Sequence, residues 1–209
     1  KVVLEDVGKL YLTQGASVGL EVEADEDVIQ LISTEVRNGK LRLRIKEPWM
    51  DRLARFFVDT WRGSHIVYRL NVIDLEHLAL YGAAKVISDA LHVDSLDLVL
   101  SGAGEVMMDD LQATHFQLML SGAGKVEAAG KVEQQRIRIT GAGKFAGEKL
   151  HSQACDVSLS GTGKAVVWSQ KELDLNISGV GKVSFFGNPK VSQRITGIGK
   201  VERLGEAPA

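Results

Sequence analysis

A seven-residue pattern recurs seven times between residues 80 and 201, and it restricts the fold more than any other feature of this 209-residue chain. Most copies read as an apolar residue, Ser or Thr, Gly, a small or apolar residue, Gly, Lys and a second apolar residue. The first glycines of the copies are Gly82, Gly102, Gly122, Gly141, Gly161, Gly179 and Gly197. They are 18 to 20 residues apart, and a period this regular indicates an array of equivalent structural units.

The residues on both sides of each glycine pair alternate between apolar and polar side chains. Leu96, Leu98 and Leu100 precede one pair, and Val106 and Met108 follow it. A period of two is typical of a strand with one buried face. A further apolar position follows in most copies, so each repeat is expected to hold two short strands and a third, separated by bends.

One such unit cannot bury its apolar face alone, but stacked units pair every strand with the coil above and below, ~4.8 Å apart. Parallel crossover connections are almost always right-handed. The expected fold class is therefore all-β, a single-stranded right-handed parallel β-helix with 18 to 20 residues per coil. We expect the glycines to adopt a positive φ or to form a corner that a Cβ would block, and the residues between them, such as Ala103 and Ile198, to point inward.

Residues 1–79 lack the glycine pair but still alternate as strands, and Asn38-Gly39 is a strong signal for a tight turn. We expect residues 1–79 to form irregular coils and a cap. Residues 80–209 are expected to form the regular coils of the same stack. The chain is thus predicted to be one continuous domain.

Residues 48–64 break the strand pattern, because their apolar residues recur at helical spacing and arginines occupy much of the remaining face. The spacing predicts a short helical insertion. Such a helix either packs on the solenoid or plugs an open end, or it offers a surface to a protein partner, a second copy or a membrane interface. The candidate partner surface consists of Trp49, Met50, Leu53, Phe56, Phe57 and Trp61.

A lysine follows most of the glycine pairs, and stacking would align these side chains along one edge. Two interpretations stay open. The lysines keep the surface of the solenoid solvated, or they form a cationic stripe for an acidic glycan or for lipid head groups. The candidate stripe consists of Lys85, Lys125, Lys144, Lys164, Lys182 and Lys200, with Glu105 in the remaining copy.

No pattern in the chain predicts a catalytic residue, a cofactor or a metal. Gly-Ala-Gly-Lys is not a phosphate loop, because no Ser or Thr follows the lysine. The five histidines share no ligand spacing, and Cys155 occupies an inward strand position, where a buried thiol is expected. The repeats vary by only two residues in length, which leaves no insertions to wall the substrate groove of a polysaccharide-cleaving enzyme.

Composition limits the partners. The net charge is −2, which favours neither nucleic acid nor an anionic membrane, and no apolar run is long enough to span a bilayer. The chain begins at Lys1 with a strand-like segment, so we expect any signal peptide to have been removed. A single cysteine carries no information about the redox compartment.

The repeated Ser/Thr-Gly-Ala/Val-Gly-Lys-Val pattern, together with Val7-Gly-Lys-Leu-Tyr-Leu12 and Asn38-Gly-Lys-Leu-Arg-Leu43, resembles the bacterial GIN-domain family. Members of this family are labelled auto-transporter adhesin head domains, and the resemblance covers nearly the whole chain. It implies a right-handed β-helix and no established catalytic residues. It also implies an extracytoplasmic location, which is periplasmic, outer-membrane-associated or at the cell surface.

The expected function is that of a non-enzymatic extracytoplasmic β-helix that serves cell-surface adhesion or contacts a polysaccharide or another envelope protein. One alternative is a structural envelope scaffold that self-associates or binds a protein partner through residues 48–64. The other is a carbohydrate-active lyase or hydrolase.

Overall fold

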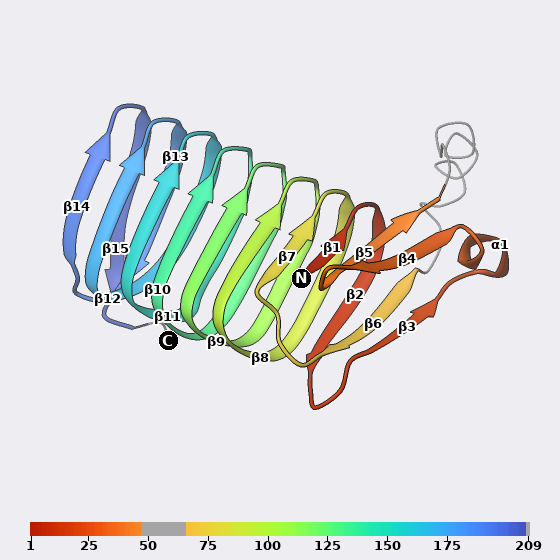
Figure 1. Cartoon of the computed structure of the whole chain (residues 1–209). Coiled ribbons are helices and arrows are strands. Elements are labelled where there is room, and N and C mark those ends of the chain that lie inside the picture. Colours follow the sequence, from red (N-terminus) through yellow and green to blue (C-terminus); the bar gives the residue numbers. More distant parts are fainter. Residues whose placement is uncertain (47–65, 208–209) are drawn as a thin grey trace.

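The computed structural model describes residues 1–46 and 66–207, which form a stack of β-coils with an irregular N-terminal end (Figure 1). Within these residues the one helix is the short α1 (Glu26–Ile29). The predicted helix at 48–64, with its candidate partner surface, lies outside the described residues. The strands of the N-terminal part are β1 (Val2–Leu4), β2 (Val7–Gln14), β3 (Gly19–Glu23), β4 (Ile32–Arg37), β5 (Lys40–Ile45), β6 (Val67–Val72) and β7 (His77–Leu80).

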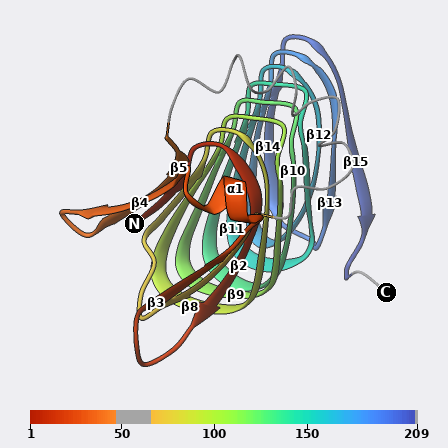
Figure 2. The ribbon, with the colours of Figure 1, turned by 90° about the vertical axis from the view of Figure 1, so that its right-hand side faces the viewer.

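The regular coils contain longer strands, each running almost once around the stack (Figures 1 and 2). The expectation of two or three short strands per coil was wrong for β8 to β12. The hydrogen-bonded ladder continues around the bend, and the chain turns through register shifts such as the one between Glu127 and Ala129. The long strands are β8 (Ala83–Leu100), β9 (Glu105–Leu120), β10 (Lys125–Ile139), β11 (Lys144–Leu159) and β12 (Thr162–Ile177). The C-terminal end of the stack is built from the shorter strands β13 (Val180–Phe186), β14 (Lys190–Ile195) and β15 (Ile198–Gly205).

Successive coils pair in parallel, and equivalent repeat positions face one another. Val86 pairs with Val106, and Val106 pairs with Val126. Together with the N-terminal strands, the coils form one 15-stranded sheet. The predicted parallel β-solenoid is thereby confirmed.

The core is made of columns of inward side chains, with one residue from each coil. Cys155 occupies such a column between Gln135 and Leu173, and burial raises the pKa of its thiol well above the usual range. The expected buried thiol is confirmed. Burying each large aliphatic side chain stabilises the stack by about 1.5–3 kcal/mol. The column just before the corners is at most 1% exposed and consists of Leu80, Leu100, Leu120, Ile139, Leu159 and Ile177.

The paired glycines allow the backbone of each corner to approach the coil before it. A Cβ on Gly122 would lie 1.9 Å from the carbonyl oxygen of Gly102, which no side chain could tolerate. A Cβ on the second glycine of the next corner, Gly143, would lie 2.3 Å from Cδ2 of Leu120. None of the seven first glycines has a φ in the left-handed region, so close approach rather than backbone conformation requires glycine here.

The residue between the two glycines points outward, and the expectation that it fills the corner was wrong. Ala103 and Ala123 are exposed, and Val180 and Ile198 are 49% and 79% exposed. The interior of the corner is already filled by the leucine column, and the alternation of the strand turns the residue after the first glycine to solvent. The corner thus carries an outward row of small or apolar side chains.

The N-terminal strands are not stacked in chain order. Strand β1 pairs with β5 on one side and β7 on the other, and β2 pairs with β6 and β8. The first two strands are therefore inserted between the outermost strands and the regular coils. Beyond them, β3 runs antiparallel to β6 and β4 runs antiparallel to β5, and the two ribbons diverge (Figure 1).

Candidate functional site

The lysines that follow the glycine pairs form one continuous row along the corners. Cross-strand pairing places equivalent positions of adjacent coils side by side, ~4.8 Å apart. Lys9 extends the row at its N-terminal end, although the prediction did not include it; its signal is the Gly8-Lys9-Leu10 sequence at the first corner. The row reads Lys9, Lys85, Glu105, Lys125, Lys144, Lys164, Lys182 and Lys200.

Carboxylates neutralise the N-terminal half of this lysine row. Glu105 lies 2.8 Å from Nζ of Lys85 and 3.7 Å from Nζ of Lys125, and Lys125 also pairs with Glu127. The hydrogen bond from Lys85 and the charges of both lysines hold the pKa of Glu105 below its ordinary value. The pairing with Glu127 raises the pKa of Lys125. Glu105 and Glu127 thus match Lys85 and Lys125, and Lys9 is the one lysine of this half without an ion pair among the described residues.

The C-terminal half of the row keeps most of its positive charge, because one carboxylate of the described residues, that of Glu202, faces its four lysines. Within the described part of the chain, Lys144 and Lys164 form no ion pair. The reason is local, because the residues two positions further along, Ala146 and Val166, are apolar where Lys125 has Glu127. Further along, Lys182 pairs with Glu202, and Lys182 and Lys200 hold the pKa of Glu202 below its ordinary value.

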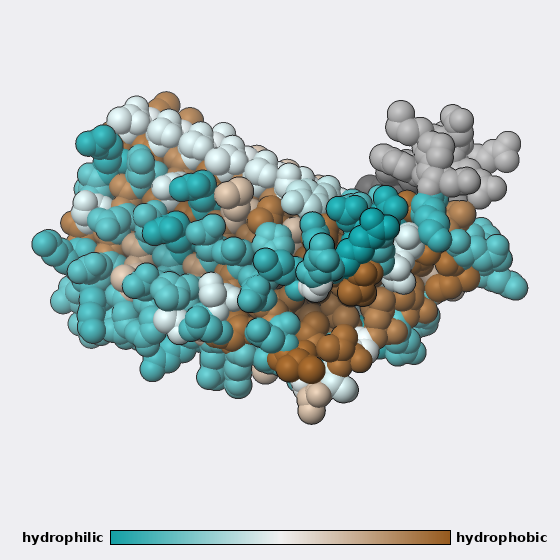
Figure 3. All heavy atoms as spheres, viewed as in Figure 1, coloured by the Kyte–Doolittle hydropathy of each residue, from teal (hydrophilic) through white to brown (hydrophobic). Residues whose placement is uncertain are grey.

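A shallow groove of about 540 Å³ follows the charged half of the row. The second glycine of each pair lies on the floor of the groove. The exposed residue between the two glycines of a pair forms the lip opposite the lysines. Figure 3 shows these corners as a pale band of intermediate hydropathy along the upper edge of the coils. The groove is lined by Gly124, Ala142, Gly143, Lys144, Thr162, Gly163, Lys164, Val180, Gly181, Lys182, Ile198, Gly199 and Lys200.

A column of exposed hydroxyl groups runs beside the groove. The backbone N–H groups of these residues are already used by the ladder; for example, Ser121 donates to the carbonyl of Leu100 at 2.9 Å. The corner therefore offers ammonium groups, hydroxyls and a flat glycine surface to a ligand. This combination suits anionic and hydroxyl-rich groups. The column consists of Ser101, Ser121, Thr140, Ser160, Ser178 and Thr196.

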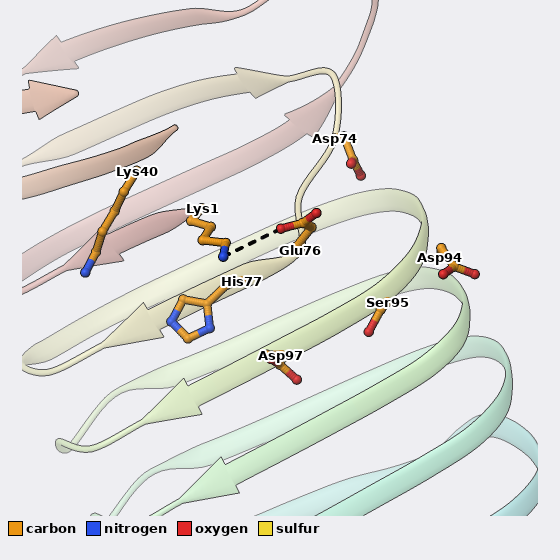
Figure 4. A pocket seen from close by; sticks show the side chains of 8 residues that line it. All are labelled: Lys1, Lys40, Asp74, Glu76, His77, Asp94, Ser95 and Asp97. Atoms are coloured by element: carbon orange, nitrogen blue, oxygen red, sulfur yellow. Dashed lines mark ion pairs between the residues drawn. The ribbon is translucent and has the colours of Figure 1, made fainter. Parts of the chain in front are cut away.

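A second, polar pocket of about 480 Å³ lies near β7 (Figure 4). Nζ of Lys1 lies 3.8 Å from Glu76, and burial lowers the pKa of His77. Among the residues that the structure describes, no three His, Cys, Asp or Glu side chains gather closely enough to hold a metal ion. The pocket is lined by Lys1, Lys40, Asp74, Glu76, His77, Asp94, Ser95 and Asp97.

Over residues 1–46 and 66–207, no helix has the length and apolar character needed to cross a bilayer.

Several solved bacterial structures share this fold. A "putative adhesin" from Bacteroides fragilis superimposes with a TM-score of 0.85, at 21% identity over 97% of this chain and 91% of that chain. A "putative lipid binding protein" from Parabacteroides distasonis gives 0.75, at 18% identity over 97% and 92%. A "putative adhesin" from Parabacteroides merdae gives 0.62, at 16% identity over 97% and 90%. At these identities the likeness establishes the fold alone.

None of the curated proteins matches this chain in sequence. The profile of one family, described as "Putative auto-transporter adhesin, head GIN domain", matches residues 1–189. This confirms the resemblance drawn from the glycine repeat, and the family implies a cell-envelope location. Since the match covers most of the sequence, the chain belongs to the family of auto-transporter adhesin head GIN domains.

Proposed function

We propose that this chain is a non-enzymatic adhesion module at the cell surface, and that it holds an extended acidic polysaccharide along the C-terminal half of its lysine row. The observation that carries the proposal is the in-register series of Lys144, Lys164, Lys182 and Lys200 beside a groove floored with glycine. A row that repeats the same groups on every coil suits a ligand that also repeats.

The chemistry of the groove favours a polymer with carboxylates and hydroxyls. Each lysine near an anionic surface contributes about 1 kcal/mol, and several in register add to one another because they engage one chain. Hydroxyls of the Ser and Thr column would hydrogen-bond sugar hydroxyls. The exposed Val180 and Ile198 on the other lip would pack against the apolar C–H faces of sugar rings.

The test measures binding to polygalacturonate, with neutral dextran as the comparison, and uses two matched double variants. Lys144→Gln/Lys164→Gln removes two unpaired charges and should weaken binding at least tenfold. Lys85→Gln/Lys125→Gln removes the same number of charges from the half that Glu105 neutralises, and should change affinity less than twofold. Raising the salt from 50 to 500 mM should weaken wild-type binding strongly, because exposed charges are screened.

Equal losses in the two double variants would contradict the assignment to the charged half. Binding to dextran as tight as to polygalacturonate would contradict an electrostatic mode altogether. Circular dichroism of each variant separates a loss of binding from a loss of fold.

A further inference from the structure

The N-terminal end of the molecule contains a cavity that the regular coils do not have. The ribbon of β4 and β5 and the ribbon of β3 and β6 are joined through α1 and spread apart away from it (Figure 2). Between them lies a cavity of about 390 Å³. Its walls are mostly apolar and come from both ribbons and from β1; they include Val2, Leu20, Leu41, Leu70 and Val72.

The mouth of this apolar cavity is rimmed by exposed hydrophobic side chains. Val18 and Val36 are each 71% exposed, and Ile73 is 55% exposed. In the described part of the chain, the one other large hydrophobic residue exposed to that extent is Ile198, at the opposite end of the stack. Figure 3 shows a hydrophobic patch at this N-terminal end. Such residues gathered around an opening mark a binding site for an apolar group.

The polar pocket near β7 adjoins the cavity, because Lys1 and Asp74 line both (Figure 4). The two spaces together would accept a molecule with an apolar tail and a polar head. The polar pocket holds more carboxylates than ammonium groups, which disfavours an anionic head. Carboxylates accept hydrogen bonds from hydroxyls, which favours a head rich in hydroxyl groups. The four carboxylates are those of Asp74, Glu76, Asp94 and Asp97, against the ammonium groups of Lys1 and Lys40.

We infer that the N-terminal cavity binds the alkyl chain of a neutral, sugar-headed amphiphile, with the head in the adjoining polar pocket. This site shares no lining residue with the groove of the lysine row, so the test of one does not depend on the other. Its ligand is a single small molecule rather than a polymer, because the residues that line the cavity do not repeat from coil to coil.

The experiment titrates the protein with dodecyl maltoside below its micelle concentration, by calorimetry or by NMR. Binding with one site per chain is expected. Shortening the tail to decyl should weaken binding by about tenfold, since each buried methylene contributes a constant increment. Dodecyl sulfate, with the same tail, should bind more weakly than the maltoside because its head is anionic. Maltose alone should not bind measurably.

Two variants test whether the amphiphile binds in this cavity. Val36→Glu introduces a charge at the mouth and should weaken binding of dodecyl maltoside at least tenfold. Leu204→Glu makes the same change at an exposed residue of β15, at the opposite end of the stack and outside the groove of the lysine row, and should leave binding unchanged. Val18→Glu replaces Val36→Glu if that variant does not fold. Absence of wild-type binding, or equal losses in Val36→Glu and Leu204→Glu, would overturn the inference. Tighter binding of dodecyl sulfate would overturn the assignment of the head.

Discussion

The regular coils and the N-terminal end bury similar apolar strands in different ways. In β8 to β12 each coil repeats the one before it, so every feature becomes a row along the stack. At the N-terminal end, β1 and β2 are inserted between strands that come later in the chain, and the faces diverge. Repetition produces surfaces suited to an extended ligand, whereas its interruption produces cavities that occur once.

The outermost corner marks the boundary between the regular coils and the N-terminal end. Asp6 occupies the first-glycine position of the outermost corner, and a Cβ on Gly82 would lie 1.7 Å from the Asp6 carbonyl oxygen. Every later corner must approach a carbonyl in this way. Asp6 instead has its side chain free to accept a hydrogen bond from the N–H of Ile45, at 2.7 Å. A side chain is thus tolerated where the corner ends the glycine column.

The largest expected effect tests this dependence on close approach. Gly122→Ala places a Cβ against the carbonyl of Gly102, and because the neighbouring backbone is held by ladders on both sides it cannot yield. We expect a loss of more than about 3 kcal/mol in the free energy of unfolding, or failure to fold. Chemical denaturation measures it.

The matched control is Gly19→Ala, at the N-terminal end, where an added Cβ meets nothing within 4 Å. This substitution should change stability by less than about 0.5 kcal/mol. A similar cost in both variants would mean that glycine in the corners serves chain flexibility rather than close approach.

Sequence periodicity predicted the regular region well and the N-terminal end poorly, and the reason is physical. A period of 18 to 20 residues determines which positions stack, so the lysine row and the leucine columns follow from it. The order of β5, β1 and β7 depends on pairings between distant segments, which alternation alone does not encode. Gln135 is a further example: it is buried between Phe116 and Cys155 because its amide donates to Ser152 Oγ at 2.9 Å, from the next coil.

The next prediction concerns Tyr68, at the N-terminal end. Its side chain lies in the same inward column as Val86 and Val106 of the regular coils. Its hydroxyl is buried and has no hydrogen-bond partner among the described residues. Burial, and to a lesser degree the charge of Asp6, raises the pKa of Tyr68 to about 12. The folded state therefore resists ionisation that the unfolded state undergoes near pH 10.

Because the pKa of Tyr68 is higher in the folded state, the neutral ring contributes its full share to the free energy of unfolding below pH 10. That contribution is lost as the pH rises toward 12. We expect the wild type to lose about 2 kcal/mol more than Tyr68→Phe over that interval. Comparing the two proteins removes the contribution of lysines that titrate in both. Parallel pH profiles for wild type and Tyr68→Phe would show that the N-terminal core admits solvent to the ring.

The smallest effect on stability, and the sharpest test of the lysine row, comes from Glu105→Gln. The Glu105 side chain is about a third exposed, so solvent screens its pairs with Lys85 and Lys125, and the substitution should cost at most about 0.5 kcal/mol at pH 7. The pKa of Glu105 is lowered in the fold, so this contribution is present above the ordinary value of 4.5 and fades as the pH falls below it. Unfolding at pH 7 and pH 3 measures both.

The same variant raises the positive charge of the N-terminal half of the row, where carboxylates match Lys85 and Lys125 in the wild type. Glu105→Gln removes the ion pairs that Glu105 forms with Lys85 and Lys125. The ion pair between Lys125 and Glu127 remains. Affinity for polygalacturonate should therefore rise by several fold, with a steeper dependence on salt. An unchanged affinity would mean that charge alone does not make a coil bind, and that the groove beside Thr162, Val180 and Ile198 is required as well. The difference between the halves would then lie in the shape of the corner rather than in one carboxylate.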